Sequence, residues 1–261
     1  MSRRKIRFEL EYDGTAYHGW QRQKGLLTIQ QVVEETLQRI TQESPVVMGA
    51  SRTDSGVHAL QQVAHFWTSR PLPDETLQKA LNATLPKDIV VKKLETTQDT
   101  FHAMQHAHSK LYRYQIENLP FATPLKRLTH WWVPSILNVE AMQEAGKIFI
   151  GTRDFRAFKT SGNNPKSTVR TIFNCEVQKS NKVITILIHG DGFLKQMVRG
   201  IVGTLVMVGK GQLSLPEVKT ILESHDRRKS GKNAPPHGLC LVSVFYDDPG
   251  PIPGNSLTFY H

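Results

Sequence analysis

The sequence predicts a mixed α+β protein built from two similar halves. Segments with strand periodicity and segments with helix periodicity alternate along the 261 residues. The order strand, helix, strand, strand, helix, strand comes first and then recurs loosely, and no low-complexity linker separates the two runs. We therefore expect two ferredoxin-like β-α-β-β-α-β halves, joined into one largely antiparallel sheet with flanking helices. A chain of this length buries about 70–75% of its unfolded surface, so its core needs no disulfide or metal.

The first half, residues 1–104, contains every element of that order. Residues 4–12 alternate apolar and polar side chains, as a strand with one buried face does. Residues 28–40 carry apolar side chains at helical spacing, and Thr28 is placed to cap the helix. The other predicted elements are strands at 45–50 and 62–68, a helix at 74–84 and a strand at 88–96.

The second half, residues 105–248, repeats the pattern more loosely. Asn138 is placed to cap one helix, Pro216 stands near the first position of another, and Ser180-Asn181 favours a hairpin. The tail, residues 249–261, contains several prolines and glycines and is predicted to be irregular. The predicted strands are 110–117, 168–178, 182–189 and 241–246, and the predicted helices are 139–150, 193–208 and 215–224.

The composition indicates a basic protein without an export signal. Net charge is +10, which favours a polyanionic partner, although an ordinary basic protein fits the charge equally well. The basic N-terminus leads into acidic residues rather than an apolar region, and the longest apolar run, residues 201–208, is too short to span a membrane. Cys175 and Cys240 are too few for a disulfide framework. We expect a cytoplasmic protein with no membrane partner.

The sequence predicts no cofactor and no metal. Neither a Gly-x-Gly-x-x-Gly string nor a Walker string appears, so no glycine-rich phosphate cradle is expected. His102, His106 and His108 match no tight zinc spacing and have no cysteine beside them.

A carboxylate in the loop between two predicted strands is the strongest candidate for chemistry. Asp54 is followed two residues later by Gly56, which adopts a positive φ at no steric cost. A short carboxylate on such a turn is positioned by the backbone. The alternative is an Asx-turn in which Asp54 merely closes the loop, and for an isolated Asp-Ser-Gly that alternative is the commoner one.

Longer segments resemble a known family. The run Arg52-Thr53-Asp54-x-Gly56-Val57-His58-Ala59 closely resembles the signature of the tRNA pseudouridine synthase A family. Five other groups of residues match that family in order, so the resemblance spans roughly residues 6–246. The matching segments are 12–23, 52–59, 101–116, 154–172, 193–203 and 234–241.

This resemblance implies a fold, an activity and a set of site residues. The fold is that of pseudouridine synthases, and the reaction isomerises uridine to pseudouridine at positions 38, 39 and 40 of the tRNA anticodon stem-loop. It implies a homodimer, with tRNA touching both subunits. Asp54 would be the catalytic residue, Arg199 its ionic partner, and Tyr112 the ring that stacks on the extracted uracil. Leu239 would seal the pocket, and Arg52 and His58 would help to bind the substrate.

The residues leave the mechanism open. An ionised Asp54 could attack C1′ of the ribose, attack C6 of the base, or remove the proton from C2′. Three positions depart from the family pattern: Ser51 and Ser55 replace other small residues, and Met104 stands where an arginine is usual. The last change puts one phosphate or ion-pair contact in doubt.

Two other function classes remain on these residues alone. A non-catalytic RNA-binding module shares the β-α-β-β-α-β order, but the aromatic strings typical of such modules are missing from the sequence. A hydrolase of glycosidic bonds would need a second carboxylate, and Asp13, in an Asp-Gly setting typical of a turn, is the candidate. Basic runs such as residues 227–232 suit a tRNA backbone track.

Overall fold

The computed structural model describes residues 3–160, 162 and 165–248. Within these residues the chain is a mixed α+β protein with five α-helices and a large, mostly antiparallel sheet, which confirms the predicted fold class. It divides into two compact units. We call Met1–His108 with Leu241–Asp248 the first unit, and Ser109–Cys240 the second unit. The predicted irregular tail, residues 249–261, lies outside the described residues.

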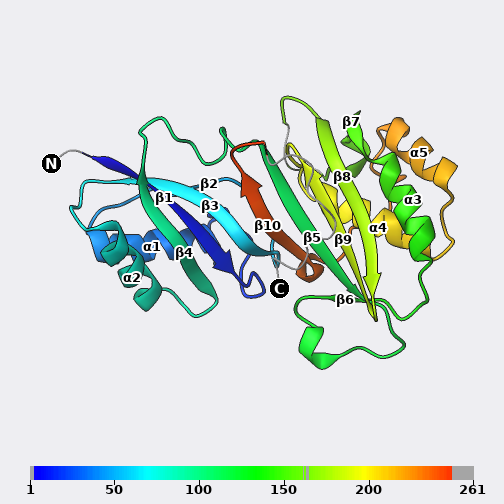
Figure 1. Cartoon of the computed structure of the whole chain (residues 1–261), viewed down its shortest axis with the longest axis horizontal. Coiled ribbons are helices and arrows are strands. Elements are labelled where there is room, and N and C mark those ends of the chain that lie inside the picture. Colours follow the sequence, from blue (N-terminus) through cyan, green and yellow to red (C-terminus); the bar gives the residue numbers. More distant parts are fainter. Residues whose placement is uncertain (1–2, 161, 163–164, 249–261) are drawn as a thin grey trace. The chain divides into compact units, whose positions relative to one another are not determined.

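The first unit has the element order that the periodicity predicts. Its strands lie in the order β4-β1-β3-β10, and α1 and α2 pack side by side against them (Figure 1). Every second residue of β1 from Ile6 to Tyr12 is buried, because one face of the strand covers the helices. The elements are β1 (Arg4–Tyr12), α1 (Ile29–Thr41), β2 (Met48–Gly49), β3 (His58–Thr68), α2 (Asp74–Thr84), β4 (Ile89–Thr97) and most of β10 (Leu239–Phe245).

Two strands of this unit differ from their predicted bounds by more than two residues. The predicted strand at 45–50 is reduced to β2, because side chains bond the backbone on either side of it. The Glu34 carboxylate accepts from the Val47 N–H (3.0 Å), and the amide of Gln62 bonds both the N–H (3.1 Å) and the carbonyl (2.7 Å) of Ser51. Strand β3 begins four residues before the prediction. It pairs with β1 as far as Tyr12 and Ala59, across a register shift after Leu10.

The second unit places its strands in the order β5-β9-β8-β7, with β6 parallel to β5. Helix α3 packs on β8 and on α4 (Figure 1). Asn138 caps α3 as predicted, and Ser214 and Glu217 form a capping box that starts α5 at its predicted residue. The elements are β5 (Ser109–Glu117), β6 (Trp131–Trp132), α3 (Val139–Ile148), β7 (Gly151–Asp154), β8 (Val169–Ser180), β9 (Val183–Gly190), α4 (Met197–Gly209) and α5 (Leu215–Ser224).

The start of α4 corrects the sequence prediction. The apolar run from 193 predicts a helix there, but Gln196 has a left-handed backbone (φ 60°), so the helix begins at Met197. The side chain of Gln196 explains this conformation in part, since its amide oxygen accepts from Thr160 (2.8 Å) and from Asn233 (2.5 Å). Strands β6 and β7 have no counterpart in the prediction.

Candidate active site

Asp54 lies in a tight turn between β2 and β3. The N–H of Val57 donates to the carbonyl of Asp54 (3.1 Å), and Gly56, the third residue of the turn, has φ 75°. These features define a type II turn, which requires a positive φ at that position. A backbone hydrogen bond thus closes the turn, and the half-buried Asp54 is its first residue.

The segment that follows β1 forms hydrogen bonds with the backbone on both sides of Asp54. Before Asp54, the Trp20 N–H donates to the Thr53 carbonyl (3.1 Å). After Asp54, the Gly56 N–H donates to the Tyr17 carbonyl (3.1 Å). Two parts of the sequence that match the same family thereby fold against each other and fix the backbone on both sides of Asp54.

Two glycines allow this close contact. A Cβ on Gly14 would stand 2.1 Å from the carbonyl oxygen of Val57, and a Cβ on Gly19 would stand 2.6 Å from that of Thr53. Gly19 also has φ 86°, a conformation that favours glycine. Any side chain at either position would push the segment away from the Asp54 loop.

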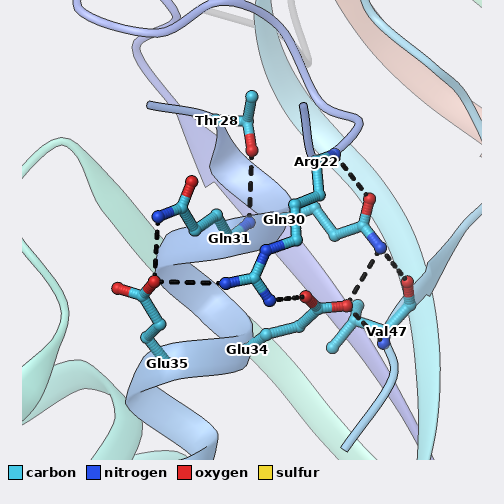
Figure 2. Close-up of polar contacts among 7 residues, drawn as sticks. All are labelled: Arg22, Thr28, Gln30, Gln31, Glu34, Glu35 and Val47. Carbon is cyan, nitrogen blue, oxygen red and sulfur yellow. Dashed lines mark hydrogen bonds and ion pairs between the residues drawn. The ribbon is translucent and has the colours of Figure 1, made fainter. Parts of the chain in front are cut away.

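Trp20 packs against β2, and a polar network holds the residues that follow it. The Trp20 indole lies so close to Gly49 of β2 that a Cβ there would be 2.5 Å from the ring. Figure 2 shows the network, which is centred on Glu34 of α1. The Glu34 carboxylate, almost fully buried, accepts from Arg22 (3.0 Å), the Gln30 amide (2.9 Å) and the Val47 N–H (3.0 Å). These bonds tie the segment after Trp20 to the helix and to the residues before β2.

His58, predicted to bind substrate, is buried at the start of β3. Its Nδ1 lies 3.1 Å from the Gly14 amide nitrogen and 3.0 Å from Oδ1 of Asp13. Burial acts to raise the pKa of Asp13, but hydrogen bonds from Thr15 and the His58 ring outweigh it and lower the pKa. Asp13 Oδ1 also accepts from the Thr15 amide (2.9 Å), so this carboxylate, the candidate for a hydrolase, closes an Asx turn. Arg52, by contrast, is exposed on the Asp54 loop.

The other predicted site residues lie in the second unit. Tyr112 on β5 is buried and meets the Phe193 ring edge-on, with centroids 5.1 Å apart. Arg199 is half-buried in the first turn of α4, where its Nε donates to the Ala234 carbonyl (2.7 Å). Leu239 is buried at the start of β10. Because Asp54 and Arg199 belong to different units, their partnership stays a prediction.

Two further residues of β5 have chemistry that the sequence reasoning did not use. Burial raises the pKa of Tyr114, against the nearby charge of Arg199, and its hydroxyl donates to the Pro235 carbonyl (2.8 Å). Burial, with a smaller effect of Arg170, lowers the pKa of Lys110 to about 8. Side chains alternate between the two faces of a strand, so Lys110 and Tyr114 lie on the same face of β5 as Tyr112. This two-residue spacing is visible in the sequence and could have identified them.

No membrane-crossing helix or metal cluster is found in the described part of the chain. None of its helices combines the length and apolarity needed to cross a membrane. Likewise, residues 3–160, 162 and 165–248 contain no group of three side chains of the metal-binding types arranged to hold an ion.

Comparison with known proteins identifies the class. The model of the family described as tRNA pseudouridine synthase matches residues 10–105 and 145–247. These ranges contain the Asp54 loop in the first unit and Arg199 in the second. The matched family and the fold are therefore those of a pseudouridine synthase, an isomerase.

Similar curated relatives define the particular family. The tRNA pseudouridine synthase A of Thermoanaerobacter sp. (strain X514) is 46% identical over 93% of this chain and 100% of its own length. That of Acetivibrio thermocellus is 45% identical, and that of Ruminiclostridium cellulolyticum 46%, each over 93% of this chain and 100% of the relative. This chain belongs to the tRNA pseudouridine synthase A family.

One solved structure, described as "Crystal Structure of a Cbf5-Nop10-Gar1 Complex", is similar only distantly. The matched chain is 12% identical to this one, and the two superpose with a TM-score of 0.36. The alignment covers 91% of this chain and 49% of that chain.

Proposed function

We propose that this protein isomerises uridine to pseudouridine at positions 38, 39 and 40 of the tRNA anticodon stem-loop, with Asp54 as the catalytic carboxylate. One observation carries the proposal: in a member of this family, backbone hydrogen bonds on both sides hold Asp54 on a type II turn. Such preorganisation is what a catalytic group needs and a mere loop-closing residue does not.

The reaction breaks the N1–C1′ bond, turns the uracil and joins its C5 to C1′. Departure of the base leaves positive character at C1′, which a nearby carboxylate stabilises. Asp54 must be ionised for any of three roles: attack on C1′, attack on C6, or removal of the C2′ proton. No redox change occurs, so the overall conversion balances without an electron donor or acceptor.

Three residues of the second unit complete the proposed site. Arg199 keeps Asp54 charged in a closed pocket, where desolvation alone would raise the pKa of the carboxyl group. The ring of Tyr112 stacks on the extracted uracil, and Leu239 seals the pocket. The edge-on contact of the buried Tyr112 with Phe193 supports this role, because it restricts the orientation of the Tyr112 ring.

The target uridine must leave its stacked position. Flipping a base costs a few kcal/mol of lost stacking and pairing. Arg52, exposed on the same loop as Asp54, takes up the vacated space or holds the flipped backbone. His58, at the start of the strand that follows this loop, helps to bind the substrate. The net charge of +10 supports binding to the tRNA backbone.

The protein works in the cytoplasm as a homodimer. Sedimentation at micromolar concentration would test the oligomeric state.

Tritium release tests the catalytic proposal. The enzyme is mixed with tRNA that carries tritium at C5 of uridine, because C5 loses its hydrogen when it bonds to C1′. The native protein and Asp99→Asn, which changes an exposed carboxylate, should release tritium. Asp54→Asn should release none while its tRNA affinity stays within about threefold, since one isosteric change removes chemistry rather than phosphate contacts.

Other outcomes distinguish the competing functions. Tight tRNA binding without tritium release by the native protein would contradict the isomerase and favour an RNA-binding module. Release of free uracil would favour a hydrolase. Mapping of pseudouridine in the product tRNA tests the positions, and modification only outside 38–40 would reject that part of the proposal.

A further inference from the structure

Arg199 is held by one residue through two hydrogen bonds. Its side-chain Nε donates to the Ala234 carbonyl (2.7 Å), and its own carbonyl accepts from the Ala234 N–H (3.0 Å). The first bond fixes the plane of the guanidinium, and the second fixes the backbone from which it extends. The orientation of Arg199 therefore depends on the position of Ala234.

The position of Ala234 depends in turn on the loop that it ends, residues 225–234. This loop lies directly on α4. A Cβ on Gly203 would stand 1.9 Å from the carbonyl oxygen of Lys232, and the Gly231 N–H donates to the Thr204 hydroxyl (3.3 Å). Substituting Gly203 would push the loop off the helix.

The guanidinium of Arg227 forms hydrogen bonds with other residues of this loop. Its Nη1 donates to the Gly231 carbonyl (3.1 Å) and to the Ser230 hydroxyl and carbonyl, while its Nη2 donates to Oδ1 of Asn233 (2.8 Å). Asn233 links the loop to the residue before α4, since its amide nitrogen donates to the side-chain oxygen of Gln196 (2.5 Å). The planar fork of arginine suits this loop, because it directs Nη1 to Ser230 and Gly231 and Nη2 to Asn233 at the same time.

We propose that Arg227 is a positioning residue for Arg199: its guanidinium fixes the 225–234 loop so that the Ala234 carbonyl orients the Arg199 side chain. The inference rests on the proposed catalytic role of Arg199. The sequence suggested that the basic run 227–232 binds the tRNA backbone. Arg227 is not part of that surface in this proposal, because both terminal nitrogens of its guanidinium bond within the protein. Its neighbour Arg228 is exposed and pairs with Asp226 (2.8 Å).

The Arg227→Lys variant separates positioning from phosphate binding. Lysine keeps the positive charge but loses the fork, so a phosphate contact would survive and the loop would not. We expect the single-turnover rate at saturating tRNA to fall about 10- to 100-fold, as misplacement of a catalytic group by about 1 Å does. The tRNA affinity and its salt dependence should change less than twofold. Arg153→Lys, an exposed arginine of the same unit, should match the native protein.

The Nε–H of Arg199 provides a readout that does not need activity. Its NMR signal is identified by its absence in Arg199→Lys. In the native protein and in Arg153→Lys, this proton should exchange slowly because it is bonded to Ala234. In Arg227→Lys it should exchange at least tenfold faster. Asn233→Ala, which removes the acceptor for Nη2, should produce the same effect in smaller measure.

Each outcome either supports or overturns the positioning role of Arg227. A native rate and native Nε–H exchange in Arg227→Lys would overturn the proposal. Lower tRNA affinity with an unchanged saturated rate would also overturn it and assign Arg227 to phosphate binding. If Arg227→Lys does not fold, Asn233→Ala carries the same comparison. If the native protein releases no tritium, the proposed function fails, and the exchange measurement still tests how Arg199 is held.

Discussion

The phenol of Tyr12 and the hydroxyl of Thr53 form a buried 2.8 Å hydrogen bond directly before Asp54. It joins the last residue of β1 to the loop that enters β3. Together with the Trp20 N–H on the Thr53 carbonyl, it leaves Thr53 bonded through both its side chain and its backbone. The residue that precedes the carboxylate is therefore anchored to the sheet.

Removing this bond should slow the reaction more than it weakens binding. In Tyr12→Phe the Thr53 hydroxyl loses its partner, which costs about 1–2 kcal/mol of stability. We expect the single-turnover rate to fall about 3- to 30-fold at saturating tRNA, because the catalytic group shifts. Thr53→Val should produce a similar fall, and the double variant should be no worse than either single one. Additive losses would show that the two hydroxyls act separately.

Gly19→Ala should disturb the Asp54 loop beyond ordinary backbone strain. Gly25→Ala is the matched control, since Gly25 also has a positive φ but no atom within 4 Å of a Cβ. The control should cost about 1–2 kcal/mol of unfolding free energy from the φ alone. Gly19→Ala should cost more and lose activity as well, because its Cβ meets the Thr53 carbonyl. Urea unfolding and tritium release measure both effects, and equal costs would contradict the close contact.

The two neighbouring glutamates of α1 should differ sharply in their contribution to stability. Glu34→Ala leaves the Val47 N–H without its acceptor and removes one of the two acceptors of the Gln30 amide, so we expect a loss of about 2–4 kcal/mol. Glu35→Ala should cost less than about 0.5 kcal/mol, because Glu35 is exposed and its pair with Arg22 is screened by solvent. Denaturant midpoints compare them, and similar losses would reject the network as a support for the Trp20 segment.

Acid should destabilise the first unit through His65. Burial, aided by the charges of His102, Lys5 and His106, lowers the pKa of His65 to about 4. Its neutral Nδ1 accepts the Ala103 N–H (3.2 Å). Between pH 6.5 and 4 the unfolded chain binds a proton that the folded chain does not.

The stability from His65 is therefore fully present above pH 6.5 and is lost as the pH falls toward 4. Its size is up to about 3 kcal/mol. His65→Gln should flatten the dependence of unfolding free energy on pH across this window. The exposed His18→Gln serves as the control for replacing a histidine by glutamine. An unchanged slope in His65→Gln would show that the ring is protonated in the fold.

Much of the fold and the tight turn at Asp54 was predictable because the relevant signals are local. The start of α5 follows from the Ser214 cap and Pro216, which act within the first turn of the helix. The alternation of β1 and the glycine two residues after Asp54 are also contained in short stretches of sequence. Such patterns reflect backbone preferences that hold whatever the rest of the chain does.

The tertiary structure alone decided which distant residues complete these local elements. Strand β2 is short because the Glu34 and Gln62 side chains bond the backbone on either side of it, and α4 starts late where Thr160 and Asn233 hold Gln196. The partners of Gln196 lie more than 30 residues away, so they meet it only when the chain closes, and periodicity carries no information about them. Arg227 bonds acceptors three to six residues away, but only the folded path of its loop decides this, and a charge run does not reveal it.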